Sequence, residues 1–271
     1  MLILTAGLAL EVHAQSIFKE QYSVASELFN KGEYFDSITE LKRLLFFDQT
    51  NEYRFRANSM MGYCYKYGAL LDEAIKYFTI AQAYAPDDSA LFSAKTEVIR
   101  CNILRHTTQN AQVLLRQLSK DKRFQGRMNE IYYWTGWVYI FEDDWAKAAL
   151  EFGRIDANHP LRELSGRVEK EKYSVSFAKV ISYILPGVGQ FYTGEYLSGI
   201  MSLGWLGLLG YYSVESFAAD RIFDGLVTTG LFLRFHRGNV QNAGKFAIEK
   251  NSEITNKALN YLQNNYEGLK P

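Results

Sequence analysis

An internal period of 37 residues constrains this chain more than any other feature. Small and large apolar positions recur in register between residues 18 and 160, four residues apart in each copy. The small positions are Ser37, Ala74, Ala111 and Ala148, and the large positions are Leu41, Phe78, Leu115 and Phe152. A fixed period of this length is typical of stacked units that are each too small to bury their own apolar face. We therefore expect four copies of one unit.

Within one copy the apolar spacing predicts two antiparallel helices joined by a short turn. In the second copy, Gly62 precedes the turn at Gly68, while Ala74 and Phe78 follow it at helical spacing. The small residues would let the two helices approach closely, and the large ones would fill the space toward the next copy. Pro86 would end the second helix, and the low proline content of the whole chain favours long helices.

The spacing from Gly62 to Ala74, Phe78, Ala81 and Pro86 resembles that of the tetratricopeptide repeat. The resemblance covers residues 15–160 as four copies and is best in the second and fourth. The first copy lacks the glycine and the proline, and the third departs at three signature positions, Ile99, Asn102 and Arg123. The resemblance implies an all-α fold: a tetratricopeptide-like helical-repeat solenoid. A charged segment, residues 161–173, is expected to form a capping helix for the last copy.

In this family the first helix of each repeat faces the ligand, so the resemblance implies a partner-binding groove. We call the matching residues the ligand face: Tyr22, Phe29, Tyr63, Lys66, Tyr67, Arg100, Tyr133, Trp137 and Phe141. Aromatic rings with scattered cations suit an apolar or extended segment of a protein or peptide partner. The alternative is that several of these side chains pack against the C-terminal half of the same chain.

Cys64 and Cys101 occupy the same position in adjacent copies. Equivalent helices in neighbouring copies should lie about 8–10 Å apart, whereas a disulfide needs Cα atoms within about 7 Å. We therefore expect two packed, free thiols.

The composition changes after Tyr173, and a hydrophobic helical hairpin is expected over residues 174–238. Residues 196–214 carry no charge, and nineteen residues span about 28 Å as a helix, close to the thickness of a hydrocarbon core. The second run, residues 222–235, is shorter and contains Asp224 and Arg234. The hairpin would contact membrane lipid. The alternative is a soluble hairpin buried against the repeats.

A proline- and glycine-rich motif opens the hairpin. Its residues are Pro186, Gly187, Gly189, Gln190, Tyr192, Gly194 and Gly199, and a closing pair follows at Gly238 and Asn239. The motif resembles the entry motif of small bacterial two-helix membrane domains. Pro186 would end the preceding helix, and Gln190 would bond to the carbonyl groups exposed at that helix end. Asn239 would cap an amphipathic C-terminal helix over residues 239–271.

The N-terminal run, residues 1–14, matches a signal peptide cleaved before Gln15, which predicts a periplasm-facing protein associated with the membrane of the cell envelope. Basic residues on both sides of the hairpin would instead place both its ends in the cytosol. Either the hairpin lies on a membrane or on the repeats without crossing, or the N-terminal run is no signal. We favour export, because the Val12-His13-Ala14 junction is the more specific signal.

The chain carries no pattern typical of an enzyme. Thirty basic and thirty acidic residues balance, and no basic tract for nucleic acid occurs. No pair of histidines has metal-ligand spacing, and we expect neither metal nor cofactor. The expected function is a non-enzymatic protein–protein interaction scaffold tethered to a bacterial envelope membrane. The alternative is a component of a membrane transport or insertion assembly, in which the hairpin is the functional part.

Overall fold

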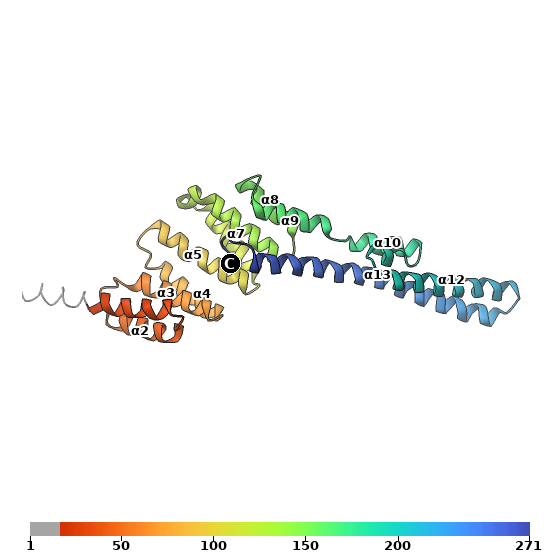
Figure 1. Ribbon diagram of the computed structural model, residues 1–271, viewed down its shortest axis with the longest axis horizontal. Helices are drawn as coiled ribbons and strands as arrows, with labels where there is room; N and C mark the ends of the chain where they lie inside the picture. The colour runs from red at the N-terminus through yellow and green to blue at the C-terminus, as the bar shows by residue number, and fades with distance from the viewer. Residues whose placement is uncertain (1–16) are drawn as a thin grey trace, which may run out of the picture. The chain divides into compact units, whose positions relative to one another are not determined.

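The computed structural model describes residues 17–271, and this part of the chain is helical with no strands (Figure 1). The expected signal peptide, residues 1–14, lies outside the described residues. The chain divides into two compact units. Unit 1 runs to Glu163 and also includes Leu269–Pro271, and unit 2 is Leu164–Gly268.

In unit 1, helices that follow each other along the chain pack against each other. A helix over residues 17–30 comes first. The others are α2 (Tyr34–Phe47), α3 (Arg54–Tyr67), α4 (Leu71–Gln82), α5 (Asp88–Leu104), α6 (Thr108–Lys120), the 3₁₀ helix η1 (Lys122–Arg127), α7 (Met128–Phe141) and α8 (Trp145–Ile155). The expected all-α class is confirmed.

The same helix ending recurs four times in unit 1 at intervals of 37 residues. Gly32, Ala69, His106 and Asp143 all have left-handed backbone, with φ of 81°, 59°, 58° and 61°. At each ending, this residue and the next donate N–H groups back into the last helical turn, as Ala69 does to Lys66 and Leu70 to Tyr65. This pair of hydrogen bonds satisfies carbonyl groups that would otherwise be exposed at the helix end. Its recurrence is a backbone period that matches the sequence period.

Two of these helix pairs are in very close contact at a glycine. A Cβ atom added to Gly62 would lie 2.7 Å from the ring of Phe78, and one added to Gly136 would lie 2.6 Å from the ring of Phe152. Both rings are fully buried. The predicted role of these glycines in close helix approach is therefore confirmed, because no larger residue fits between the helices.

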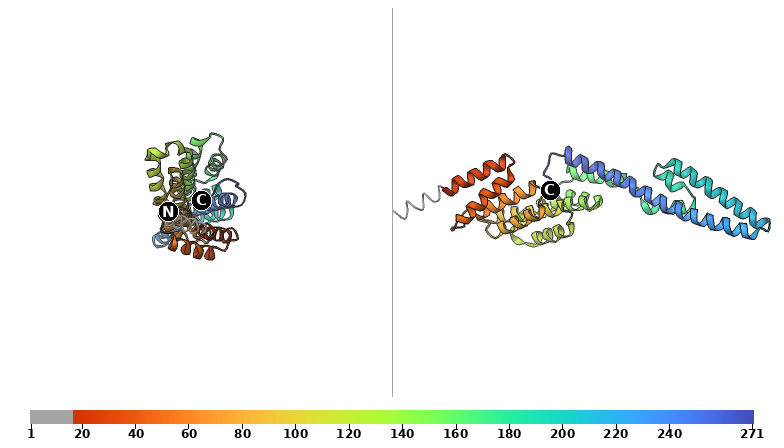
Figure 2. Two further views of the ribbon diagram at one scale, coloured as in Figure 1. Left: turned by 90° about the vertical axis from the view of Figure 1, so that its left-hand side faces the viewer. Right: turned by 90° about the horizontal axis from the view of Figure 1, so that it is seen from below.

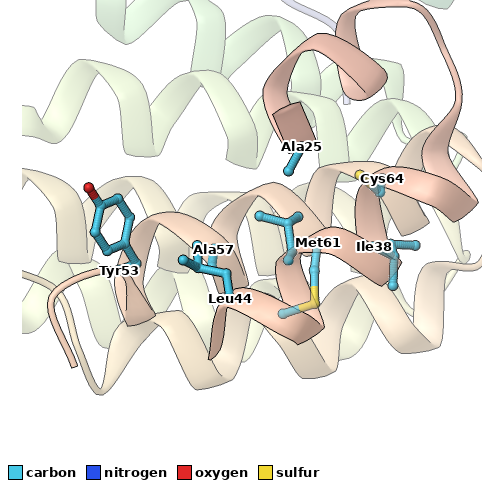
Figure 3. Close-up of a cluster of buried hydrophobic side chains, with 8 residues drawn as sticks. Ala25, Ile38, Leu44, Tyr53, Ala57, Met61 and Cys64 are labelled. Atoms are coloured by element: carbon cyan, nitrogen blue, oxygen red, sulfur yellow. The ribbon is translucent and has the colours of Figure 1, made fainter. Parts of the chain in front are cut away.

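The first apolar cluster of unit 1 joins the helix 17–30 to α2 and α3. Figure 3 shows Ala25 from the first of these helices, Ile38 and Leu44 from α2, and Met61 from α3. Ser37 also lies at this junction, and its hydroxyl donates to the Ala25 carbonyl over 2.8 Å. A buried hydroxyl with such a partner can therefore replace the alanine of the later copies.

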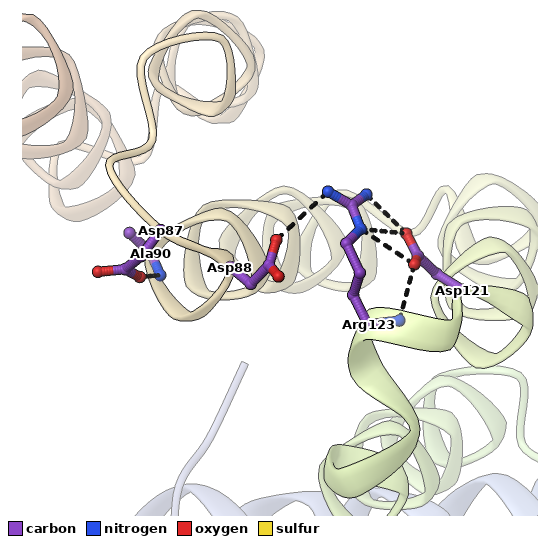
Figure 4. A network of polar contacts seen from close by, with 5 residues as sticks. All are labelled: Asp87, Asp88, Ala90, Asp121 and Arg123. Carbon is purple, nitrogen blue, oxygen red and sulfur yellow. Dashed lines mark hydrogen bonds and ion pairs between the residues drawn. The ribbon is translucent and has the colours of Figure 1, made fainter.

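Arg123 lies 37 residues from both Pro86 and Pro160, and it forms a polar connection at the position where they have proline. The Arg123 guanidinium group bonds to both carboxylate oxygens of Asp121 and reaches Asp88 at the start of α5 over 3.3 Å (Figure 4). The adjacent Asp87 caps α5 by accepting the N–H of Ala90. Hydrogen bonding to Arg123 also lowers the pKa of Asp121.

Unit 2 consists of the end of α9 (Pro160–Glu171), α10 (Val175–Ile184), the short α11 (Val188–Tyr192), α12 (Tyr196–Ala218) and α13 (Ile222–Asn264). Figure 2 shows α13 as one unbroken helix. The expected helix start at Asn239 is therefore wrong, and the segments 174–238 and 239–271 share this helix. Asn239 lies in its interior, because its side chain is used in packing against α10 and α11 rather than in capping.

Helix α12 exposes many large apolar side chains, including Leu197, Ile200 and Val214. Among residues 17–271, it is the one helix that is long and apolar enough to cross a membrane, and only 11% of its most apolar stretch is buried. The tip beyond it is charged, since Arg221 bonds to Glu215 over 3.1 Å and lies 3.9 Å from Asp224.

Candidate functional site

A buried ionic cluster lies at the centre of the ligand face. Glu97 accepts Lys66 Nζ over 3.0 Å on one carboxylate oxygen and Arg100 Nη1 on the other. The Lys66 and Glu97 side chains are 7% and 6% exposed, so both are almost removed from water. Burial lowers the pKa of Lys66, although Glu97 favours its charged form. Two cations share one carboxylate, which leaves the cluster with an excess positive charge.

An aromatic cluster adjoins the ionic one. Tyr67 packs against Phe29, Tyr34 and Tyr63, with ring centroids 5.9, 5.8 and 6.4 Å apart. Tyr67 itself is 60% exposed, whereas Phe29 and Tyr63 are half-buried. Burial, with a smaller effect of Glu97, raises the pKa of Tyr63 to about 12. The rings thus form a partly exposed apolar surface beside the charges.

Arg100 and Tyr133 bind the backbone of the last residues of the chain. Arg100 Nη2 donates to the Lys270 carbonyl over 2.6 Å, and the Tyr133 hydroxyl group donates to the Leu269 carbonyl. Both side chains are braced by Trp134. Its ring lies 4.9 Å below the Arg100 guanidinium group and meets the Tyr133 ring edge-on at 5.1 Å. At these two residues the ligand face thus contacts the C-terminal part of the same chain, the arrangement given above as the alternative to partner binding.

The remaining residues of the ligand face lie in other contacts. Tyr22 packs on Tyr53 at 5.6 Å. Trp137 is 3% exposed and packs on Phe141, which also contacts the ring of His106. The structure therefore brings together six of the nine residues, Phe29, Tyr63, Lys66, Tyr67, Arg100 and Tyr133, through shared neighbours.

Sequence reasoning missed three residues that hold this surface together: Glu97, Trp134 and Tyr34. Glu97 lies three residues before Arg100, a spacing that places both on one helix face and could have indicated their pairing. Trp134 lies beside Tyr133 in the same aromatic stretch. Tyr34 belongs to the second helix of its copy, where the family resemblance assigns no ligand contacts.

The hairpin motif of unit 2 forms a buried hydrogen-bond network. The side-chain amide of Gln190 donates to Asn239 Oδ1 over 2.6 Å and accepts the Ser182 hydroxyl over 3.1 Å. Asn239 accepts the N–H of Gly187 and donates to the Ser182 carbonyl over 3.1 Å. Asn239, rather than Gln190 as expected, therefore satisfies a carbonyl group at the end of α10.

The glycines of the motif differ in what surrounds them. Gly187 and Gly194 have positive φ, at 89° and 80°. A Cβ atom on Gly189 would collide with the Ala178 carbonyl and the Ser182 hydroxyl, and one on Gly199 would lie 2.5 Å from Phe191. Gly238 has open space around it. Close packing therefore requires Gly187, Gly189 and Gly199, whereas Gly194 has open space and is favoured as glycine by its positive φ alone.

The end of the preceding helix agrees with the motif. Helix α10 ends at Ile184, two residues before Pro186. The Tyr192 hydroxyl group accepts the N–H of Ser174 over 3.1 Å, and its ring meets those of Tyr173 and Phe177 edge-on. The motif thus contacts both ends of α10, its start through Tyr192 and its end through Asn239.

The two cysteines are free and buried, as expected. Cys64 Sγ lies 3.6 Å from the Ser37 hydroxyl group. Cys101 belongs to a different apolar cluster, and its burial raises the pKa of its thiol to about 11. Neither thiol is poised for nucleophilic chemistry, which needs the thiolate.

Within the described part of the chain, no three His, Cys, Asp or Glu side chains gather closely enough to hold a metal ion. Unit 2 has an open pocket of about 610 Å³ between α12 and α13. Trp205, Arg234 and Asn239 are among its lining residues.

Residues 17–271 thus form an all-helical structure with a buried ionic cluster and, within that range, one helix both long and apolar enough to cross a membrane. Comparison with protein-family models, with curated proteins and with solved structures gave no match.

Proposed function

We propose that this protein is a non-enzymatic scaffold that binds an extended segment of another protein. In this proposal, residues 15–160 form a tetratricopeptide-like repeat domain whose ligand face receives the partner. The observation that carries the proposal is a pair of hydrogen-bond donors, Arg100 and Tyr133. They bind two successive backbone carbonyl groups of the chain itself, in residues 269–270. Donors that bind backbone recognise an extended chain whatever its side chains.

The recurring helix endings support the repeat assignment. They fall at the same register in all four copies, including the third, where the residue-by-residue match to the family pattern is poorest. In the second and fourth copies, a phenylalanine ring packs directly against a glycine of the facing helix, Phe78 against Gly62 and Phe152 against Gly136. This shared contact supports the assignment for these two copies.

The charge of the ligand face supports a partner with acidic or carbonyl groups. Lys66 and Arg100 outnumber Glu97, so an incoming oxygen meets positive charge in a poorly hydrated place, where electrostatic attraction is stronger than in water. Tyr67 beside them offers an exposed ring for an apolar side chain.

Membrane tethering is the second part of the proposal. The length, composition and exposure of α12 support it. Residues 174–238 would act as a hydrophobic helical hairpin, and the motif network would fix α10 and α11 against α13 at its base. With residues 1–14 acting as a signal peptide, the ligand face would lie in the periplasm.

Panning random twelve-residue peptides on phage against the full chain in detergent tests the binding function. Selected peptides should bind Tyr67→Ala and Arg100→Gln about tenfold more weakly than the wild type, because a ring contact and a charged hydrogen bond are lost. Arg43→Gln is the matched control, because Arg43 also pairs with a glutamate three residues earlier, at an exposed place. Selected peptides that bind both variants with the affinity of the wild type would overturn the proposal.

A carbonate wash of bacterial membranes tests the tether. The wild-type chain should stay in the pellet, and Leu208→Asp in α12 should shift it toward the supernatant, since an aspartate at the centre of a membrane helix costs about 3 kcal/mol. Leu150→Asp, at an exposed position of α8, should leave the distribution unchanged. A wild-type chain that washes off completely would rule out an integral hairpin.

A further inference from the structure

We propose that residues 269–271, Leu-Lys-Pro, are an internal ligand of the ligand face that a partner must displace. The inference rests on the proposed function and names the resident occupant of the same surface. The segment belongs to unit 1 by its contacts, although 105 residues assigned to unit 2, Leu164–Gly268, separate it from the rest of that unit.

The contacts have the geometry of backbone recognition. Two neighbouring carbonyl groups, of Leu269 and Lys270, are bound by side chains from two different helices, α7 and α5. The Leu269 side chain is 67% exposed and contributes little apolar burial. Both hydrogen bonds go to main-chain carbonyl groups, so another extended peptide can take the place of the segment and accept the same two hydrogen bonds.

Two further contacts hold the Arg100 guanidinium group in position. Nη1 is bound to Glu97, the guanidinium plane lies over Trp134, and Glu97 is itself held by Lys66. Nη2 therefore points to the carbonyl of Lys270 without further ordering. A preorganised donor loses little conformational freedom on binding, which favours the short segment despite its few contacts.

The segment also competes by virtue of being attached. A tethered ligand acts at an effective concentration of the order of millimolar, so even weak contacts can keep it bound much of the time. The apparent affinity of any outside peptide then falls by the fraction of time that the surface is free. We expect this self-occupancy to weaken outside binding about tenfold.

A peptide with the sequence of residues 262–271, labelled with fluorescein, tests the inference by fluorescence anisotropy. A variant truncated after Gly268 should bind this peptide about tenfold more tightly than the wild type does. In that truncated chain, Tyr133→Phe should weaken binding about fivefold, because it removes one hydroxyl donor and keeps the ring packing. Arg43→Gln in the same chain should have no effect.

The possible results separate this inference from the proposed function. If the phage-selected peptides bind the truncated chain but the 262–271 peptide does not, the internal ligand is wrong and the binding function stands. If neither binds, both fall. Equal affinity of the peptide for wild-type and truncated chains also overturns the inference. If the wild type self-associates in sedimentation and the truncated chain does not, the segment occupies a second copy, and the internal arrangement is wrong.

Discussion

Ala69 and His106, which lie 37 residues apart, end their helices with the same left-handed backbone, at φ of 59° and 58°. Both positions are equivalent to Gly32, where glycine adopts this conformation without a side-chain penalty. Asp143 is the fourth equivalent position, so the fold imposes one backbone shape on four different residue types.

Ala69→Gly should raise the free energy of unfolding of unit 1 by about 0.5–1 kcal/mol, because it relieves the steric cost of a Cβ atom in left-handed backbone. Gly32→Ala should lower it by a similar amount at the equivalent turn, where open space removes any other cause. Chemical denaturation in detergent measures both. A loss of stability for Ala69→Gly would contradict the claim that the left-handed backbone of Ala69 is strained.

Gly62→Ala should lower the free energy of unfolding by about 1–3 kcal/mol, although alanine favours helices more than glycine does. The new methyl group would push the buried ring of Phe78 and separate α3 from α4. Gly126→Ala is the control, because no atom lies within 4 Å of its added Cβ. Its thermal melting should differ little from that of the wild type.

The phenol of Tyr63 should ionise at about pH 12, against an ordinary pKa of 10.0. The folded-state pKa is raised, so its contribution to stability is complete below pH 10 and is lost as pH rises toward 12. Ultraviolet titration of tyrosinate, compared between wild type and Tyr63→Phe, isolates this group. A smaller loss of stability between pH 10 and 12 in Tyr63→Phe than in the wild type would agree with it. A titration midpoint near pH 10 for the tyrosinate absorbance lost in Tyr63→Phe would contradict it.

Cys101 should resist alkylation in the folded chain. Burial raises its pKa from 9.0 to about 11, which lowers the thiolate fraction at neutral pH about a hundredfold. Iodoacetamide should label neither Cys101 nor Cys64 before denaturant is added, and both afterwards. Cys101→Ser assigns the signals. Fast labelling of Cys101 in native protein would show that this cluster opens.

Gln190→Ala should lower the free energy of unfolding of unit 2 by about 2–4 kcal/mol. The change removes the acceptor of the buried Ser182 hydroxyl group and one of the two N–H donors to Asn239 Oδ1, and water has no access to replace them. Asn242→Ala, at an exposed position of α13, is the matched control. Proteolysis in detergent, followed over denaturant concentration, compares the two. Equal stability of both variants would show that water replaces the lost bonds.

The network around Gln190 shows how far a motif can be interpreted without its partner. The spacing of prolines and glycines indicates a sharp turn after a helix, and the turn occurs there. The sequence offers no signal that Asn239 lies inside a continuous helix, because a glycine and a polar residue together look like a helix boundary. Packing against α10 and α11 outweighs that local preference, since an asparagine side chain can bond to three groups at once.

The sequence by itself determined the elements: the period of 37, the close approach at Gly62 and Gly136, the all-helical class and the uncharged helix near residues 196–214. These follow from short-range spacing, because side-chain size and helical periodicity act within one or two helices. Tertiary structure alone decided the rest. It placed Glu97 between Lys66 and Arg100, and it brought Leu269 and Lys270 to Tyr133 and Arg100. Such contacts join residues distant along the chain, and they depend on how complete helices pack, which no local pattern encodes.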